Sequence, residues 1–182
     1  MAQLSIHALG PLRVTLDGDP VTAFESTKVQ ALLVYLALES DVPHTREALA
    51  GLLWPDQPGE TARRNLRQAL FNLRLAIGDR EAAPPFLLIT RRTVQLNRES
   101  DYWLDAAAFN AHVGASEAHP AEGERPGGTD NRGATVYREA EAAARFSGPR
   151  HRVERCPYCI EHLGKAMALY RGSFLEGFFV DK

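Results

Sequence analysis

Residues 62–74, ARRNLRQALFNLR, combine cationic and amide side chains with no acidic residue among them. The segment holds four arginines, two asparagines and one glutamine. Arginine, asparagine and glutamine are the side chains that bind guanine and adenine edges bidentately in the major groove of DNA. Residues 63–92 carry seven arginines against Asp79 and Glu81, although the whole chain has a net charge of −2. A basic surface within a near-neutral chain indicates an anionic partner.

Apolar spacing predicts that residues 60–77 form one long helix. Successive side chains on a helix are about 100° apart, which collects one apolar stripe of Ala62, Leu66, Ala69, Leu70, Leu73 and Ile77. The other positions point outward, and we expect the DNA-binding set to be Arg63, Arg64, Asn65, Arg67, Gln68, Phe71, Asn72 and Arg74. An ordinary solvated helix surface is the alternative. Such a surface usually pairs opposite charges at i and i+4, worth about 0.2–0.5 kcal/mol each, and here only Glu60 can offset the arginines.

The segments before and after this helix predict the fold that holds it. Alternating apolar residues in the first 25 positions predict a small antiparallel sheet. A helix beginning near Ser26 or Thr27 follows, and Thr45 can cap a second helix that ends at Leu53. Residues 86–96 predict a hairpin with Arg91 and Arg92 at its turn. A short helix, a long basic helix and a hairpin, in this order, are typical of a winged helix-turn-helix, whose third helix enters the major groove while the wing contacts an adjacent groove or phosphates.

The carboxyl half is predicted to be helical and interrupted. A helix begins at Asp105, residues 114–133 are rich in Gly, Pro, Glu and Asp and predict a mobile linker, and helical sequence returns at 134–146 and 159–170. We therefore expect an α+β chain with a DNA-binding domain at 1–99 and a second domain at 100–182. The longest apolar run has eight residues, whereas a membrane span needs about 20. Without a secretory signal at the amino terminus, the expected location is cytoplasmic.

Several motifs resemble a known family. The segments LGPLRVTLDG, KVQALLVYLAL, REALAGLLWPD and ARRNLRQALFNLR look like the OmpR-type winged helix of the SARP-like bacterial transcriptional activators. DYWLDAAAFNAHV and ALYRGSFLEGF resemble their adjoining bacterial transcriptional activator domain. The resemblance implies an all-helical, tetratricopeptide-like second domain that is only partly present here. It also implies a homodimer on direct repeats of double-stranded DNA and recruitment of RNA polymerase.

A separate cluster, HRVERCPYCIEH, places four metal-ligand residue types within residues 151–162: His151, Cys156, Cys159 and His162. These side chains are the ligands that zinc prefers, although structural zinc sites usually take ligand pairs from separate elements. CPYC is also a glutaredoxin-like redox motif, which needs a thioredoxin fold around it. Plain thiols are the first interpretation, zinc the second and redox catalysis the last.

Motifs of catalysis are few. The sequence lacks a phosphate-cradling glycine loop, a Gly-x-Ser-x-Gly elbow and an HExxH pair, so we expect a protein that is not an enzyme. Two alternatives to DNA binding stay open from the residues alone. One is a protein-interaction module that presents the basic surface to an acidic protein, and the other is a zinc or thiol sensor built on the Cys-x2-Cys segment.

Overall fold

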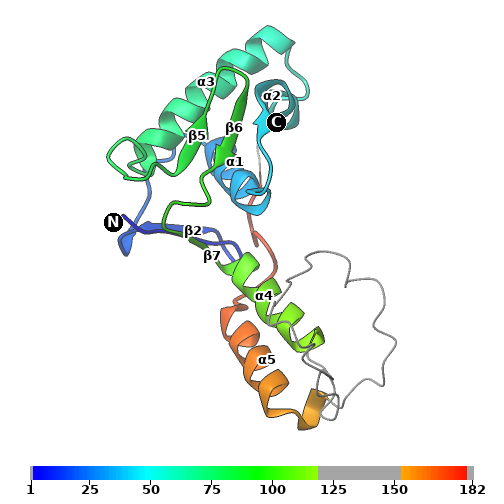
Figure 1. Ribbon diagram of the computed structural model, residues 1–182. Helices are drawn as coiled ribbons and strands as arrows, with labels where there is room; N and C mark the ends of the chain where they lie inside the picture. Colours follow the sequence, from blue (N-terminus) through cyan, green and yellow to red (C-terminus); the bar gives the residue numbers. More distant parts are fainter. Residues whose placement is uncertain (1, 119–152, 180–182) are drawn as a thin grey trace, which may run out of the picture.

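Two small sheets and the helices around them form the amino-terminal part of the computed structural model, which describes residues 2–118 and 153–179 (Figure 1). Helices α1 (Thr27–Leu38), α2 (Arg46–Leu53) and α3 (Gly59–Ala76) pack together and against the second sheet. The chain is thus α+β, as predicted. The predicted ends of the long basic helix agree with those of α3 to within one residue.

The amino-terminal sheet is mixed, so the antiparallel sheet predicted from the first 25 residues is correct for three strands but incomplete. Strands β1 (Leu4–His7), β2 (Arg13–Leu16) and β3 (Asp19–Pro20) are antiparallel, but β7 (Tyr102–Leu104) pairs with β1 in parallel. The strand order is β3-β2-β1-β7. Because β7 comes from nearly 100 residues further along the chain, no local pattern in the first 25 residues could reveal it. Strand β7 lies beyond the predicted domain boundary at residue 99, yet it belongs to the amino-terminal sheet.

A cap fixes the start of α2. The Thr45 hydroxyl accepts a hydrogen bond from the Ala48 N–H at 3.2 Å, as the sequence predicts. We expect Thr45→Ala to lower the free energy of unfolding by about 0.5–2 kcal/mol, because this N–H then loses its partner. Ser26, the N-cap of α1, makes no side-chain cap hydrogen bond, so Ser26→Ala is the matched control. Urea unfolding of the two variants tests this, and equal losses would contradict it.

The second sheet carries the predicted hairpin. Strands β5 (Leu87–Ile89) and β6 (Thr93–Leu96) are antiparallel, and the short strand β4 (His44–Thr45) pairs with β6 on its other side. Because β4 leads directly into α2, the hairpin is tied to the start of that helix. Figure 1 shows the hairpin beside α3, with its tip at the end of the fold where α3 begins.

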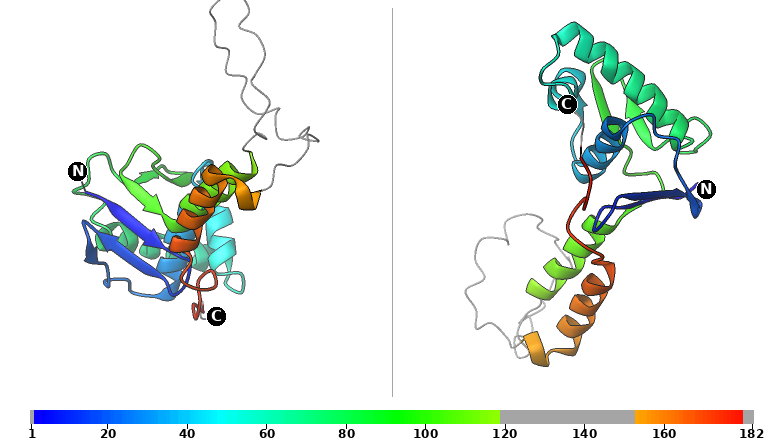
Figure 2. Two further views of the ribbon diagram at one scale, coloured as in Figure 1. Left: turned by 90° about the horizontal axis from the view of Figure 1, so that it is seen from below. Right: turned by 180° about the vertical axis from the view of Figure 1, so that it is seen from behind.

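Beyond β7, two helices form a separate pair. Helix α4 (Asp105–Glu117) and helix α5 (Pro157–Leu169), which follows the short 3-10 helix η2 (Val153–Arg155), lie side by side and run in opposite directions (Figures 1 and 2). Helix α4 continues through Glu117, so the linker predicted from residue 114 begins too early. The rest of that linker and the helix predicted at 134–146 lie outside the described residues.

After α5 the chain returns to the amino-terminal sheet. The Gly10 N–H donates to the Ser173 carbonyl at 3.0 Å, and the Leu175 N–H donates to the Ala8 carbonyl at 2.7 Å. These bonds hold residues 173–175 against the segment that follows β1. Within residues 2–118 and 153–179, none of the helices combines the length and the hydropathy of a membrane span.

Candidate nucleic-acid interface

The buried side of α3 is the predicted one. All six residues of the apolar stripe are at most 5 % exposed and belong to the main core: Ala62, Leu66, Ala69, Leu70, Leu73 and Ile77. Burying this stripe against α1, α2 and the second sheet fixes which side of α3 faces outward.

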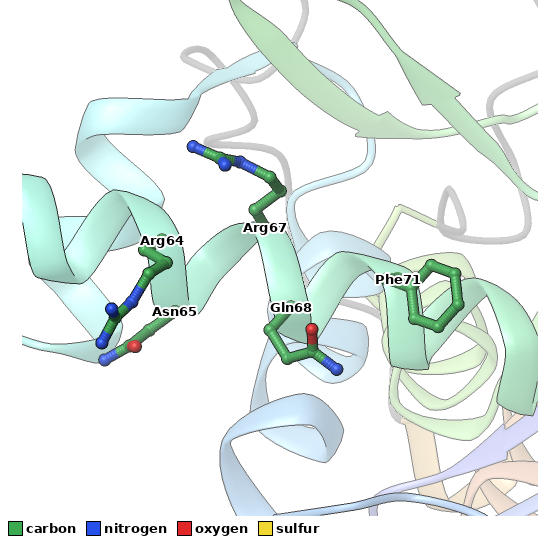
Figure 3. A pocket seen from close by; sticks show the side chains of 5 residues that line it. All are labelled: Arg64, Asn65, Arg67, Gln68 and Phe71. Carbon is green, nitrogen blue, oxygen red and sulfur yellow. The ribbon is translucent and has the colours of Figure 1, made fainter.

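The outward side carries most of the predicted cations and amides. Arg63, Arg64, Arg67 and Gln68 are exposed, and Asn65 is half-buried. Arg64, Asn65, Arg67, Gln68 and Phe71 line one surface hollow, in which Arg64 and Asn65 reach out next to each other and Gln68 follows along the helix (Figure 3). Within the described part of the chain, the three exposed arginines make no ion pair. Their charges are therefore available to an anionic partner.

Asn72 was predicted to point outward, and this placement is wrong. Its side chain is 4 % exposed. The amide oxygen accepts from the Glu25 N–H at 3.0 Å and the amide nitrogen donates to the Ala23 carbonyl at 3.3 Å. The residue ties α3 to the loop before α1, so it holds the helix in place and does not reach the outward surface.

This position gives a stability prediction. Asn72→Ala should lower the free energy of unfolding by about 1–3 kcal/mol, because it removes two part-buried hydrogen bonds, each worth about 0.5–1.5 kcal/mol. Asn65→Ala removes the same side chain from the outward side of the same helix and should change stability by no more than about 0.5 kcal/mol. Thermal or urea unfolding of both variants measures the difference. A loss of similar size in both would show that the Asn72 hydrogen bonds contribute little.

Arg74 is engaged with an acidic residue, unlike the other arginines of α3. Its Nε lies 2.7 Å from a carboxylate oxygen of Asp79, which is 1 % exposed. The other oxygen of Asp79 accepts the Leu87 N–H at 2.8 Å. One buried carboxylate thus joins the end of α3 to the first strand of the hairpin. The ion pair partly neutralises Arg74, which the sequence had placed among the DNA contacts.

The hairpin tip presents Arg91 and Arg92 as predicted. Both are exposed, and the Thr90 N–H donates to the Thr93 carbonyl at 2.9 Å, which leaves the two arginines as the tip. The turn lacks the Asn-Gly or Asp-Gly expected of a tight hairpin. Instead, the Thr90 hydroxyl accepts the N–H groups of Arg92 and Thr93 at 3.1 and 2.9 Å.

Two further arginines support this surface, although neither was among the predicted DNA contacts. The Arg46 Nε donates to the Thr90 carbonyl at 3.1 Å, which braces the hairpin tip against the start of α2. The Arg80 guanidinium lies 5.4 Å from the centre of the Phe71 ring, which is 50 % exposed. A cation over a ring at this distance is attracted by it. Arg80 belongs to the basic segment 63–92, but its contact with Phe71 arises only after the chain turns at the end of α3.

A buried carboxylate also joins the two parts of the structure. Asp105, 1 % exposed at the start of α4, accepts the N–H groups of Ala8 and Leu9 at 2.8 and 3.0 Å. Arg171, beyond α5, donates to the same carboxylate at 3.3 Å. His7 lies beside this cluster, and burial and the Arg171 charge lower the pKa of His7, against a smaller opposing effect of Asp105.

The predicted metal ligands are only partly brought together. Cys156 and Cys159 lie in contact at the start of α5, and burial, followed by the hydrogen bond with Cys156, raises the pKa of the Cys159 thiol. The His162 ring instead faces His112 of α4, with their Nδ1 atoms 3.2 Å apart. Among the described residues, no three His, Cys, Asp or Glu side chains are grouped so that they could hold a metal ion. His151 lies outside the described residues, so a zinc site stays a prediction.

Comparisons with known proteins agree with the motifs in the sequence. No family model matches the chain. Curated relatives named transcriptional regulatory protein EmbR, from Mycobacterium bovis and two strains of Mycobacterium tuberculosis, are 33 % identical over 86 residues, which is 47 % of this chain and 22 % of each relative.

The solved structure of Mycobacterium tuberculosis EmbR in complex with a low affinity phosphopeptide is similar in fold, with a TM-score of 0.62 and 23 % identity, in a comparison that covers 98 % of this chain. The match covers 38 % of the EmbR chain, so the present chain spans a minor part of the proteins it resembles. Over about half of its length, the chain distantly resembles EmbR, a SARP-family transcriptional regulator.

Proposed function

We propose that the chain is a sequence-specific DNA-binding transcription regulator that acts as an activator. The observation that carries the proposal is the outward side of α3, where exposed Arg63, Arg64, Arg67 and Gln68 have no acidic partner among the described residues. The similarity to transcriptional regulatory protein EmbR supports it independently.

In this proposal α3 enters the major groove. Arg64 and Gln68 bind base edges, for which their side chains are suited, and Asn65 and Phe71 border the same hollow. Arg63 and Arg67 bind phosphates. Arg74 also binds a phosphate, but more weakly, because Asp79 partly neutralises its charge. From the wing, Arg91 and Arg92 contact an adjacent groove or phosphates. Asn72 supports the helix from the buried side, so we do not propose a DNA contact for it.

The remaining roles follow from the family resemblance. We propose that residues 1–99 are the DNA-binding part and that the α4–α5 pair begins a tetratricopeptide-like domain within residues 100–182. A homodimer on direct repeats and contact with RNA polymerase complete the proposal. Strand β7 gives the second part a fixed attachment, because it pairs with β1 in the amino-terminal sheet.

Binding to double-stranded DNA tests the proposal. A binding site is selected from a random duplex pool with the whole chain, and its affinity is compared with that of random duplex at two salt concentrations. We expect Arg64→Ala and Gln68→Ala each to reduce the discrimination by about 1–3 kcal/mol, because each removes one base contact. Arg91→Ala should instead weaken binding to all duplexes and reduce the salt slope by about one.

Arg13→Ala is the matched control for the arginine variants, because it removes an exposed positive charge from β2 in the other sheet. It should leave the discrimination between sequences unchanged. Equal affinity for every duplex, unaffected by the α3 variants, would reject the proposal and favour an acidic protein as the partner of this surface.

A further inference from the structure

The first turn of α5 brings the two cysteines of the chain together. Cys156 is the N-cap residue of α5 and Cys159 lies three positions further on. Residues three apart on a helix have Cβ atoms about 5–6 Å apart, and a disulfide needs about 3.5–4.5 Å. The Cys156 and Cys159 side chains already share a hydrogen bond. Because the backbone of Cys156 is extended (φ −92°, ψ 112°) and lies outside the helical turns, it can close the remaining distance without disrupting α5.

The two cysteine residues are both buried, but to different degrees. Cys156 is 8 % exposed, whereas Cys159 is fully buried. The Cys159 thiol donates to the Ser116 carbonyl at 3.5 Å, which joins α5 to the last turn of α4. A dissolved reagent therefore meets Cys156 first, and Cys159 is positioned behind it.

We propose that Cys156 and Cys159 form a thiol–disulfide site, which a low-molecular-weight disulfide oxidises to an intramolecular disulfide. The Cys156 thiol loses its proton to water, and the resulting thiolate attacks one sulfur of the external disulfide. The external S–S bond breaks, one small thiol leaves, and Cys156 is held in a mixed disulfide. Cys159 then loses its proton and attacks the Cys156 sulfur, which releases the second small thiol. In total, two protein thiols are oxidised and one external disulfide is reduced to two thiols.

Oxidation at this site changes the contact between α4 and α5. As a disulfide sulfur, Cys159 has no S–H, so it no longer donates to the Ser116 carbonyl. The redox state of the pair is thereby linked to the packing of the carboxyl-terminal helices. Cys156 acts as the attacking residue and Cys159 as the resolving residue.

The whole purified chain, reduced and then incubated with defined ratios of glutathione disulfide to glutathione, provides the test. Samples are quenched in acid, labelled with N-ethylmaleimide and weighed by mass spectrometry. The chain has two cysteines, so the reduced protein takes two labels. At high ratios we expect a product that takes no label, carries no glutathione and remains a single chain.

Single substitutions separate the two roles. Cys159→Ser should stop at a mixed disulfide with one glutathione on Cys156. In Cys156→Ser the remaining thiol, Cys159, is buried. This variant should react with glutathione disulfide about tenfold more slowly than Cys159→Ser does, and the difference between the two variants should disappear in urea. The proposal would be overturned if the wild type kept two labels or accumulated a mixed disulfide. Disulfides between chains, or one zinc ion per chain that blocks both thiols, would also overturn it.

Discussion

Asp105→Ala is expected to lower the free energy of unfolding by about 3–5 kcal/mol, because it removes a buried carboxylate shared by two buried backbone N–H groups and the partly exposed Arg171. The carboxylate is 1 % exposed and accepts two backbone N–H groups and the Arg171 guanidinium. Its removal leaves the N–H groups of Ala8 and Leu9 without acceptors, and each unsatisfied donor costs about 1–3 kcal/mol. Urea unfolding followed by circular dichroism measures the loss.

Two further variants make the Asp105 result interpretable. Asp101→Ala removes an exposed carboxylate four residues earlier, whose only side-chain contact in the described structure is a 3.5 Å hydrogen bond from Gln3. It should change stability by no more than about 0.5 kcal/mol. Asp105→Asn keeps one acceptor and should fall between the wild type and Asp105→Ala, which preserves the test if the alanine variant does not fold. A loss below about 1 kcal/mol for Asp105→Ala would show that this carboxylate does not hold the two parts together.

Asp79→Ala has the second large expected effect, a loss of about 3 kcal/mol in the free energy of unfolding. Asp79 accepts both the Arg74 Nε and the Leu87 N–H, so it joins the proposed recognition helix to the wing. Without it, the Leu87 N–H is buried and unpaired. We place the effect at the lower end of the range because Arg74 is 36 % exposed and water can solvate it.

The variant should also weaken binding to the selected DNA duplex, because the wing is then less firmly placed beside α3. Glu81→Ala, which removes an exposed acid two residues further on, is the control and should unfold like the wild type. Asp79→Asn retains an acceptor for the Leu87 N–H and should recover part of the stability. If Asp79→Ala and Glu81→Ala unfold alike, the Asp79 carboxylate is not what joins the helix to the wing.

Features that depend on neighbours in sequence were predicted correctly. The apolar stripe of α3 has a helical period, and period alone identifies the side that must be buried. The Thr45 cap and the arginine-tipped hairpin are also local, because each is decided by residues within a few positions of one another.

Features that depend on distant residues were missed or misplaced. The helical projection placed Asn72 on a flank of α3, but the loop before α1 covers that flank and offers Ala23 and Glu25 as hydrogen-bond partners. Arg74 was expected to be unpaired, but the turn after α3 places Asp79 beside it, and the two form an ion pair. The contact of His162 with His112 of α4 was missed, because the two residues are 50 positions apart in the chain.

The sequence by itself determined the first three helices, the hairpin, the basic character of α3 and the buried side of that helix, because short-range periodicity and local charge decide them. Only the tertiary structure decided that β7 completes the first sheet, that Asp105 and Asp79 connect separate elements, and which predicted side chains remain exposed. The physical reason is that buried carboxylates and amides must find partners for their polar atoms, and those partners are backbone groups whose approach no side-chain pattern records.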